Sequence, residues 1–169
     1  WALWIRPKPC CSADMTDFRI ALIGYGTAGA IFHAPLIAAT PGLALAAIVT
    51  RRQAEAARAA YPEAAILESA ESLWARADAF DAVVIATPNA THVSLAHAAI
   101  EAGLAVIIDK PMAAHVAEAD ALMVAARRAD VALTVFHNRR WDSDFLTVAD
   151  LIARDALGDI RRFESRFER

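Results

Sequence analysis

The sequence contains little cysteine: only Cys10 and Cys11 occur among its 169 residues, and they are adjacent. Vicinal cysteines rarely form a disulfide, because the small ring strains the bond geometry. A disulfide framework is therefore excluded, and no cysteine or histidine spacing resembles a zinc site. We expect a protein of a reducing, cytoplasmic compartment that holds no metal.

The sequence also lacks a strong excess of one charge and lacks any long apolar run. Its 17 Lys+Arg and 20 Asp+Glu give a net charge of −3, which offers no general attraction to a polyanion, so we expect no nucleic-acid partner. Charges interrupt every apolar stretch before the roughly 18 to 20 residues of a membrane-spanning helix, so we expect no membrane partner. The 57% hydrophobic content excludes a disordered chain and suffices for the core of one domain.

The two ends of the sequence differ from its alanine-rich middle. Residues 1–14 hold two of the four tryptophans and both cysteines, and Met15 directly precedes a strand-like run. We expect residues 1–14 to be a leader foreign to the domain and poorly ordered. After Gly158, apolar and charged residues alternate up to Arg169, which predicts one half-exposed strand over 159–169 that stops in mid-pattern.

Between these ends, short apolar runs alternate with longer amphipathic stretches, a pattern typical of βαβ units. The predicted strands are residues 18–23, 43–50, 64–67, 82–86, 105–108 and 132–136. The predicted helices are residues 27–39, 53–60, 69–77, 91–102, 117–129 and 143–154. The fold class is therefore α/β, with a doubly wound parallel sheet (Rossmann) over 15–142. Residues 143–169 are expected to be a connecting helix and the first strand of a truncated second domain.

A glycine-rich turn follows the first predicted strand and matches G-x-G-x-x-G: Gly24-Tyr25-Gly26-Thr27-Ala28-Gly29. The first glycine permits a tight turn, the second lets the backbone approach a pyrophosphate, and the third lets the helix pack on the strand. The N-terminus of the next helix supplies N–H donors to phosphates. We predict that these residues bind a dinucleotide; the alternative is a glycine turn without a ligand.

The second predicted strand ends in Thr50-Arg51-Arg52. NAD-binding domains carry an acidic residue at this point, which binds the ribose 2′-hydroxyl. A guanidinium can instead form charge-assisted bonds to a 2′-phosphate and can stack on the adenine. These residues favour NADP over NAD as the cofactor; the alternative is a pair of solvated arginines at a helix start.

The loop after the fourth predicted strand contains Thr87, Pro88, Asn89 and His92. It lies at the carboxyl edge of the sheet, where open α/β folds bind ligands. We predict that these residues line the dinucleotide, and that Thr91 caps the next helix. His92 could instead satisfy a local carbonyl group.

Lys110 follows the fifth predicted strand, in Asp109-Lys110-Pro111. Burial or neighbouring cations can lower the pKa of such a lysine, and its ammonium group can donate a hydrogen bond to a substrate hydroxyl. We predict that Lys110 is catalytic and also lies at the cofactor. The alternative is a surface lysine in a turn.

The sixth predicted strand is followed by a polar loop: His137-Asn138-Arg139-Arg140-Trp141. These donors could bind the nicotinamide or a polyhydroxylated substrate. An interdomain hinge with Trp141 packed at the junction is an equal alternative. His33, inside the first predicted helix, is interpreted as structural.

Together these motifs, in this order and spacing, resemble the Gfo/Idh/MocA family of NAD(P)-dependent oxidoreductases over residues 18–169. The polar loop and Phe32-His33-Ala34-Pro35-Leu36 resemble more narrowly the subgroup that contains NADP-dependent scyllo-inositol dehydrogenase. The resemblance implies a Rossmann domain followed by an α+β domain that closes the substrate site and mediates homo-oligomerisation.

The resemblance also implies roles for single residues. Lys110 matches the lysine of the family's Glu-Lys-Pro motif, which contacts substrate and cofactor and assists proton transfer. Asp109 replaces the glutamate of that motif. The family's catalytic Asp and His lie in the second domain, and this implies that they fall beyond Arg169.

We therefore expect the cofactor-binding part of an oxidoreductase that transfers hydride between NADP(H) and a hydroxyl or carbonyl carbon of a sugar or cyclitol. The chain alone is expected to bind NADP(H) without turnover. The alternative is a non-catalytic NAD(P)-sensing or regulatory Rossmann module, because a fold alone does not establish turnover.

Overall fold

The computed structural model describes residues 17–166 and 168. The leader predicted for 1–14 and its adjacent cysteines lie outside these residues. The chain forms two compact units, which meet in the sequence between Phe136 and His137. The sequence pattern placed this boundary slightly later, at 142.

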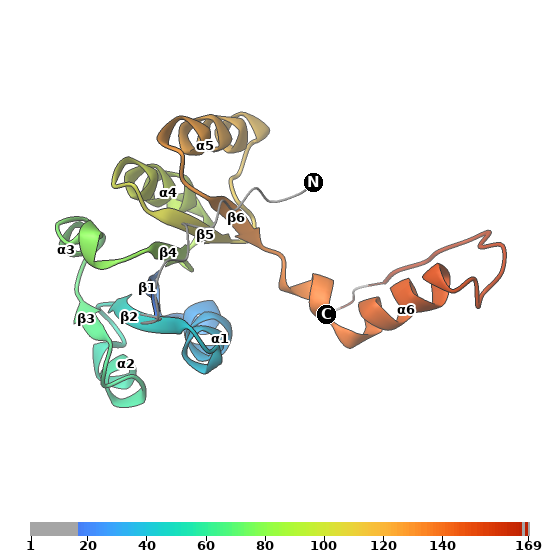
Figure 1. The fold of residues 1–169 in the computed structure, drawn as a ribbon, viewed down its shortest axis with the longest axis horizontal. Helices are drawn as coiled ribbons and strands as arrows, with labels where there is room; N and C mark the ends of the chain where they lie inside the picture. Colours follow the sequence, from blue (N-terminus) through green and yellow to red (C-terminus); the bar gives the residue numbers. More distant parts are fainter. Residues whose placement is uncertain (1–16, 167, 169) are drawn as a thin grey trace, which may run out of the picture. The chain divides into compact units, whose positions relative to one another are not determined.

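The first unit is built on a six-stranded parallel sheet (Figure 1). Its strands are β1 (Phe18–Ile23), β2 (Leu43–Val49), β3 (Ala65–Leu67), β4 (Ala82–Ile85), β5 (Ala105–Asp109) and β6 (Leu133–Phe136). Their spatial order is β3-β2-β1-β4-β5-β6. The chain therefore winds outward from β1 in one direction and from β4 in the other, which confirms the doubly wound Rossmann fold.

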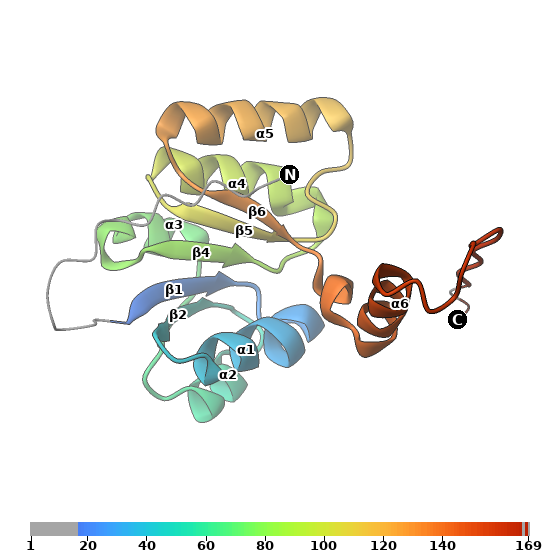
Figure 2. The ribbon, with the colours of Figure 1, turned by 45° about the vertical axis from the view of Figure 1, so that its right-hand side comes forward.

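Helices cover both faces of this sheet. They are α1 (Ala34–Ala39), α2 (Ala54–Ala60), α3 (Ala70–Trp74), α4 (His92–Glu101) and α5 (Val116–Ala129), with short 3₁₀ turns η2 (Ala77–Ala79) and η3 (Asn89–Thr91). Figure 2 shows α1 and α2 on one face and α3, α4 and α5 on the other. A π-helical segment, η1 (Gly29–His33), precedes α1. None of the helices in the described part of the chain is both long and apolar enough to cross a bilayer.

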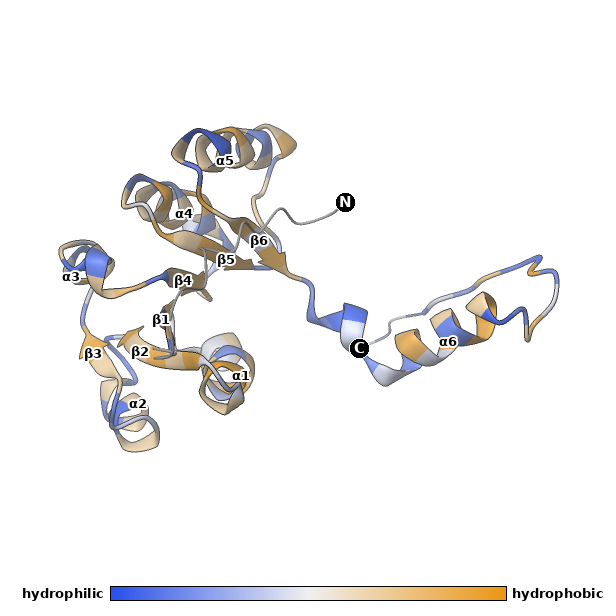
Figure 3. Ribbon diagram, in the orientation of Figure 1, coloured by the Kyte–Doolittle hydropathy of each residue, from blue (hydrophilic) through white to orange (hydrophobic). Residues whose placement is uncertain are grey.

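The core consists of two apolar clusters, one on each face of the sheet. Successive strand residues point to opposite faces, so in β1 Ile23 packs with Leu73 and Leu122 on one side, while Leu22 packs with Ile37 on the other. Burial of each such side chain contributes about 1.5 to 3 kcal/mol. Strands buried on both faces need apolar residues throughout; all four residues of β4 are apolar and buried, and β4 is coloured as hydrophobic in Figure 3.

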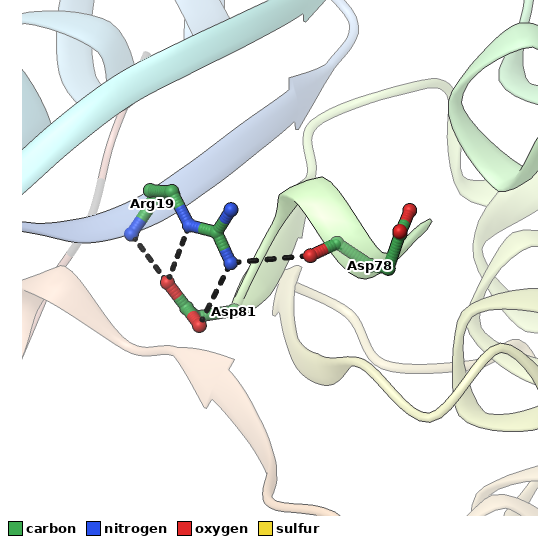
Figure 4. A network of polar contacts seen from close by, with 3 residues as sticks. All are labelled: Arg19, Asp78 and Asp81. Carbon is green, nitrogen blue, oxygen red and sulfur yellow. Dashed lines mark hydrogen bonds and ion pairs between the residues drawn. The ribbon is translucent and has the colours of Figure 1, made fainter. Parts of the chain in front are cut away.

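The amino-terminal end of β1 is tied to the segment before β4 by a polar network (Figure 4). The backbone N–H and Nε of Arg19 both donate to Asp81 Oδ2, at 2.8 and 3.2 Å, and a terminal nitrogen donates to the Asp78 carbonyl at 3.2 Å. The Asp81 N–H donates back to the Arg19 carbonyl at 2.8 Å. Because these groups lie at the end of β1 opposite the glycine turn, they stabilise the sheet and stand apart from the predicted site.

The second unit contains the 3₁₀ turn η4 (Asn138–Trp141) and helix α6 (Ser143–Ala153). The helix confirms the predicted span of 143–154 closely. The strand expected over 159–169 is wrong for the residues described there, which form no strand. A strand must pair its backbone groups with a neighbour, and the described part of this unit contains no other strand. None of its described residues is buried.

Candidate dinucleotide-binding site

Four of the predicted site segments lie at the same edge of the sheet. The glycine turn follows β1, Thr50-Arg51-Arg52 follows β2, residues 87–92 follow β4, and Lys110 follows β5. Because these strands are parallel, their carboxyl ends meet at one edge. The order of the strands reverses between β1 and β4, and such a reversal opens the crevice in which doubly wound folds bind ligands.

The three motif glycines meet different surroundings. Gly24 has a φ of +98°, and a Cβ added there would lie 2.5 Å from the Ala86 carbonyl oxygen. A Cβ on Gly29 would lie 2.0 Å from the Gly24 carbonyl oxygen. A Cβ on Gly26 would meet nothing within 4 Å, and Gly26 is exposed. Gly24 is thus closed by the segment that follows β4 and Gly29 by Gly24 itself, while Gly26 leaves its backbone open to a pyrophosphate.

The other residues of the turn differ in their surroundings: the Tyr25 ring packs inside the chain, whereas Thr27 and Ala28 lie at the start of a helix. Tyr25 is buried, and its ring meets the edge of Tyr61 at a centroid distance of 6.3 Å. Burial raises the pKa of Tyr61, and Tyr25 acts in the same direction. Thr27 is exposed and Ala28 half-buried at the helix start, where N–H groups have no partner within the helix. The Tyr25 ring is thus largely packed within the chain, and its contact with a cofactor stays a prediction.

The two arginines after β2 face solvent. Arg51 and Arg52 are exposed, and Thr50 is half-buried; its N–H donates to the last residue of β3 at 2.9 Å. Backbone and Ser69 hydrogen bonds lower the pKa of Glu71, and the charge of Arg51 lowers it further. Arg51 is therefore within electrostatic reach of a carboxylate, and both guanidinium groups are accessible to an anionic ligand.

The loop after β4 is held by the hydroxyl of Thr91. Thr91 Oγ1 lies 2.7 Å from Thr87 Oγ1 and 2.8 Å from the Pro88 carbonyl. Thr91 occupies the N-cap position of α4, but its side chain makes no capping hydrogen bond, so the predicted cap is wrong: the hydroxyl bonds backward to the loop. Pro88 and Asn89 are exposed, and Thr87 is half-buried.

His92 is buried beneath this edge, with 1% of its surface exposed. Its Nδ1 lies 2.8 Å from the Pro111 carbonyl, and its Nε2 lies 2.8 Å from the Thr87 carbonyl. These are the contacts of the alternative in which His92 satisfies local carbonyl groups. Contact between His92 and the cofactor stays a prediction.

Lys110 is exposed at the end of β5. Its backbone N–H donates to Asp109 Oδ1 at 2.8 Å. The carboxylate of Asp109 thus fixes the main chain at the lysine, while the ammonium group is left accessible to solvent.

One residue at this edge was not assigned to it from the sequence. His33 is buried, with its Nε2 4.0 Å from Asp109 Oδ2 and its ring centroid 4.4 Å from that of Phe136. Burial lowers the pKa of His33, and the Asp109 carboxylate opposes that shift. From the sequence His33 is interpreted as structural, and no motif links it to strand ends so distant in the sequence.

The polar loop predicted at the nicotinamide or substrate belongs to the second unit. His137, Arg139, Arg140 and Trp141 are exposed and Asn138 is half-buried. Arg139 donates to Asp142 at 2.7 Å. Trp141 is 77% exposed, and the roles of this loop at the nicotinamide or substrate, or as a hinge, stay predictions.

Comparison with known proteins agrees with this geometry. The Gfo/Idh/MocA profile, described as an oxidoreductase family with an NAD-binding Rossmann fold, matches residues 18–137. The chain is 44% identical over 153 residues to the oxidoreductase YdgJ of Escherichia coli (strain K12), covering 90% of this chain and 44% of that protein. It is 35% identical over 151 residues to scyllo-inositol 2-dehydrogenase (NADP(+)) IolW of Bacillus subtilis (strain 168), covering 89% and 42%.

A solved structure gives the same result for the fold. An oxidoreductase from Yersinia pestis superimposes with a TM-score of 0.81 at 41% identity, over 87% of this chain and 42% of that chain. The chain spans less than half the length of the curated relatives described above.

Proposed function

Because the chain belongs to the Gfo/Idh/MocA family of oxidoreductases, we propose that it is the cofactor-binding part of an NADP(H)-dependent oxidoreductase acting on a sugar or cyclitol. The reacting group is a hydroxyl or carbonyl carbon. The similarity to a scyllo-inositol 2-dehydrogenase (NADP(+)) supports both the cofactor and the substrate class. The proposal includes a reducing cytoplasmic setting, which the low cysteine content predicts, and a homo-oligomer, which the family resemblance implies.

The observation that carries this proposal is the contrast among the three glycines. Gly24 and Gly29 are closed by their neighbours, and Gly26 faces open space at the switch point of the sheet. A turn that merely joined a strand to a helix would have no need of an open glycine between two closed ones. A pyrophosphate needs this opening, because its oxygens must approach backbone N–H groups closely.

Each remaining segment has a proposed task. Arg51 and Arg52 bind the 2′-phosphate through charge-assisted hydrogen bonds, and the exposed loop residues Pro88 and Asn89 line the dinucleotide. When bound, the nicotinamide supplies or accepts the hydride. The ammonium group of Lys110 donates a hydrogen bond to the substrate oxygen and stabilises the charge that develops there. The loop 137–141 contributes donors to the substrate or nicotinamide.

A valine at Gly26 tests the proposal directly. In Gly26→Val the new side chain would occupy the space assigned to the pyrophosphate, while its Cβ meets no atom of the chain within 4 Å. We expect NADPH affinity, measured by fluorescence titration, to fall at least about tenfold, the effect of about 1.4 kcal/mol. The free energy of unfolding in urea should change by less than about 1 kcal/mol.

Gly29→Ala provides the contrast. Its Cβ would meet the Gly24 carbonyl at 2.0 Å, so this variant should lose stability as well as NADPH binding. NADPH affinity that is unchanged in Gly26→Val, or absent in the wild-type chain, would overturn the proposed function.

A further inference from the structure

His33 holds a buried nitrogen atom without a hydrogen bond. The residue is 4% exposed, and its Nε2 has no hydrogen-bond partner among the described residues. Leaving a buried polar atom unpaired costs about 1 to 3 kcal/mol, and such atoms are uncommon in folded proteins. Because this unpaired nitrogen lies at the carboxyl edge of the sheet, where the dinucleotide is proposed to bind, it indicates a functional role for the His33 side chain.

The unpaired nitrogen faces the carboxylate of Asp109. The 4.0 Å from Nε2 to Asp109 Oδ2 exceeds hydrogen-bond length, and an approach of about 1 Å would close it. The ring of Phe136 lies 4.4 Å from that of His33 at a tilt of 50° and restricts the imidazole plane. Hydrogen bonds that are long in a ligand-free site often tighten in the complex.

The other oxygen of Asp109 is already engaged. Oδ1 accepts the backbone N–H of Lys110 at 2.8 Å. One carboxylate therefore stands between His33 and the main chain of Lys110, the residue proposed to contact the substrate. Any hydrogen bond that fixes the carboxylate from the His33 side also fixes the lysine backbone.

On its other side, His33 is connected to the glycine turn. It ends the π-helical segment that begins at Gly29. Gly29 packs closely on the Gly24 carbonyl, because a Cβ added at Gly29 would lie 2.0 Å from that carbonyl oxygen. Short π-helical turns occur frequently at functional sites. A pyrophosphate bound at this turn would therefore act directly on the segment that carries His33.

We propose that His33 is a positioning residue: when a dinucleotide fills the glycine turn, His33 Nε2–H donates to Asp109 Oδ2, and Asp109 then holds the backbone of Lys110 in place. This inference rests on the proposed function for its ligand and adds a link between cofactor binding and the lysine. Burial lowers the pKa of His33 against the opposing effect of Asp109, which favours a neutral ring with one N–H to donate.

Amide hydrogen exchange of Lys110, followed by NMR with and without NADPH, tests the link. In the wild-type chain NADPH should slow this exchange by about tenfold beyond the apo rate. The NADPH affinity of His33→Leu should stay within about threefold of wild type, a change in binding free energy of less than 1 kcal/mol. The same variant should lose most of the NADPH-dependent slowing of Lys110 amide exchange. His33→Gln retains an N–H donor and should recover part of it. His97→Leu, which replaces a half-buried histidine of α4, should behave as wild type.

A double variant and the tautomer of His33 complete the test. In an Asp109→Ala background, His33→Leu should have no further effect on the exchange of Lys110, because the two side chains act in series. Imidazole ¹⁵N shifts of the wild-type complex should place the proton on Nε2. A proton on Nδ1, or full NADPH-dependent slowing in His33→Leu, would overturn the inference even if one variant fails to fold.

The result also separates the two proposals. If NADPH binds the wild-type chain but does not slow Lys110 exchange, the link is wrong and the proposed function stands. If NADPH does not bind at all, both are wrong.

Discussion

The buried ring of His92 joins two loops of the candidate site. Its Nδ1 lies 2.8 Å from the Pro111 carbonyl and its Nε2 2.8 Å from the Thr87 carbonyl, so one side chain spans the ends of the neighbouring strands β4 and β5. A neutral imidazole donates one of these hydrogen bonds at a time. His92 thereby sets the distance between the loop proposed for the cofactor and the loop that carries Lys110.

Replacing His92 with phenylalanine should destabilise the first unit. The ring volume is largely kept, but the N–H donor of the imidazole is lost and a buried carbonyl group loses its hydrogen bond, so the free energy of unfolding should fall by about 1 to 3 kcal/mol. Urea denaturation measures this effect. His97→Phe, on the same helix and only half-buried, is the control and should cost less. Unchanged stability with complete loss of NADPH binding would instead make His92 a direct cofactor ligand.

The choice between NADP and NAD depends on the arginines after β2. Arg51→Ala with Arg52→Ala should weaken NADPH binding at least about tenfold, since each charge-assisted hydrogen bond contributes about 1.5 to 3 kcal/mol. NADH binding should change far less. Fluorescence titration with both nucleotides measures the difference, and Arg58→Ala, an exposed arginine of α2, is the control. Equal losses for both nucleotides would show that the arginines do not read the 2′-phosphate.

Replacement of Lys110 tests whether the proposed enzyme or the alternative sensing module is correct. In the protein that contains this chain, Lys110→Ala should lower kcat/KM for an inositol or aldose by about 10² or more, the scale for a lost proton-transfer or charge-stabilising group. NADPH affinity should change much less. Lys110→Arg should not restore activity, because a guanidinium keeps its proton near neutral pH. Near-normal kcat/KM in the alanine variant would favour the surface-lysine interpretation.

The burial of His33 should make stability depend on pH. Its pKa is lowered in the folded chain from an ordinary value of 6.5, so below about pH 6.5 the unfolded state binds more protons than the folded state. The free energy of unfolding should therefore fall as the pH falls from 6.5 through the lowered pKa. Urea unfolding at pH 7.5 and 5.5 measures this loss, and His33→Gln should reduce it. An equal loss in that variant would assign the pH dependence to other groups.

The sequence by itself determined the sheet, the helices and the glycine turn. Strands buried on both faces must be apolar throughout, and helices on the faces must be amphipathic, so both signals are local and repeat along the chain. The G-x-G-x-x-G spacing is equally local, because the turn, the phosphate approach and the helix contact involve neighbouring residues. These features also position Arg51 and Lys110, since each directly follows a strand whose end the pattern marks.

Only the tertiary structure decided which distant side chains meet. His33 faces Asp109, and His92 reaches Pro111, because helix starts and strand ends from separate βαβ units converge at one edge; no periodicity encodes such pairs. The same holds for Tyr25, whose ring packs on Tyr61 although its motif position suggested a ligand contact. The alternation over 159–169 predicted a strand that the described residues of this range, 159–166 and 168, do not form, because a strand exists only where another chain segment pairs with its backbone.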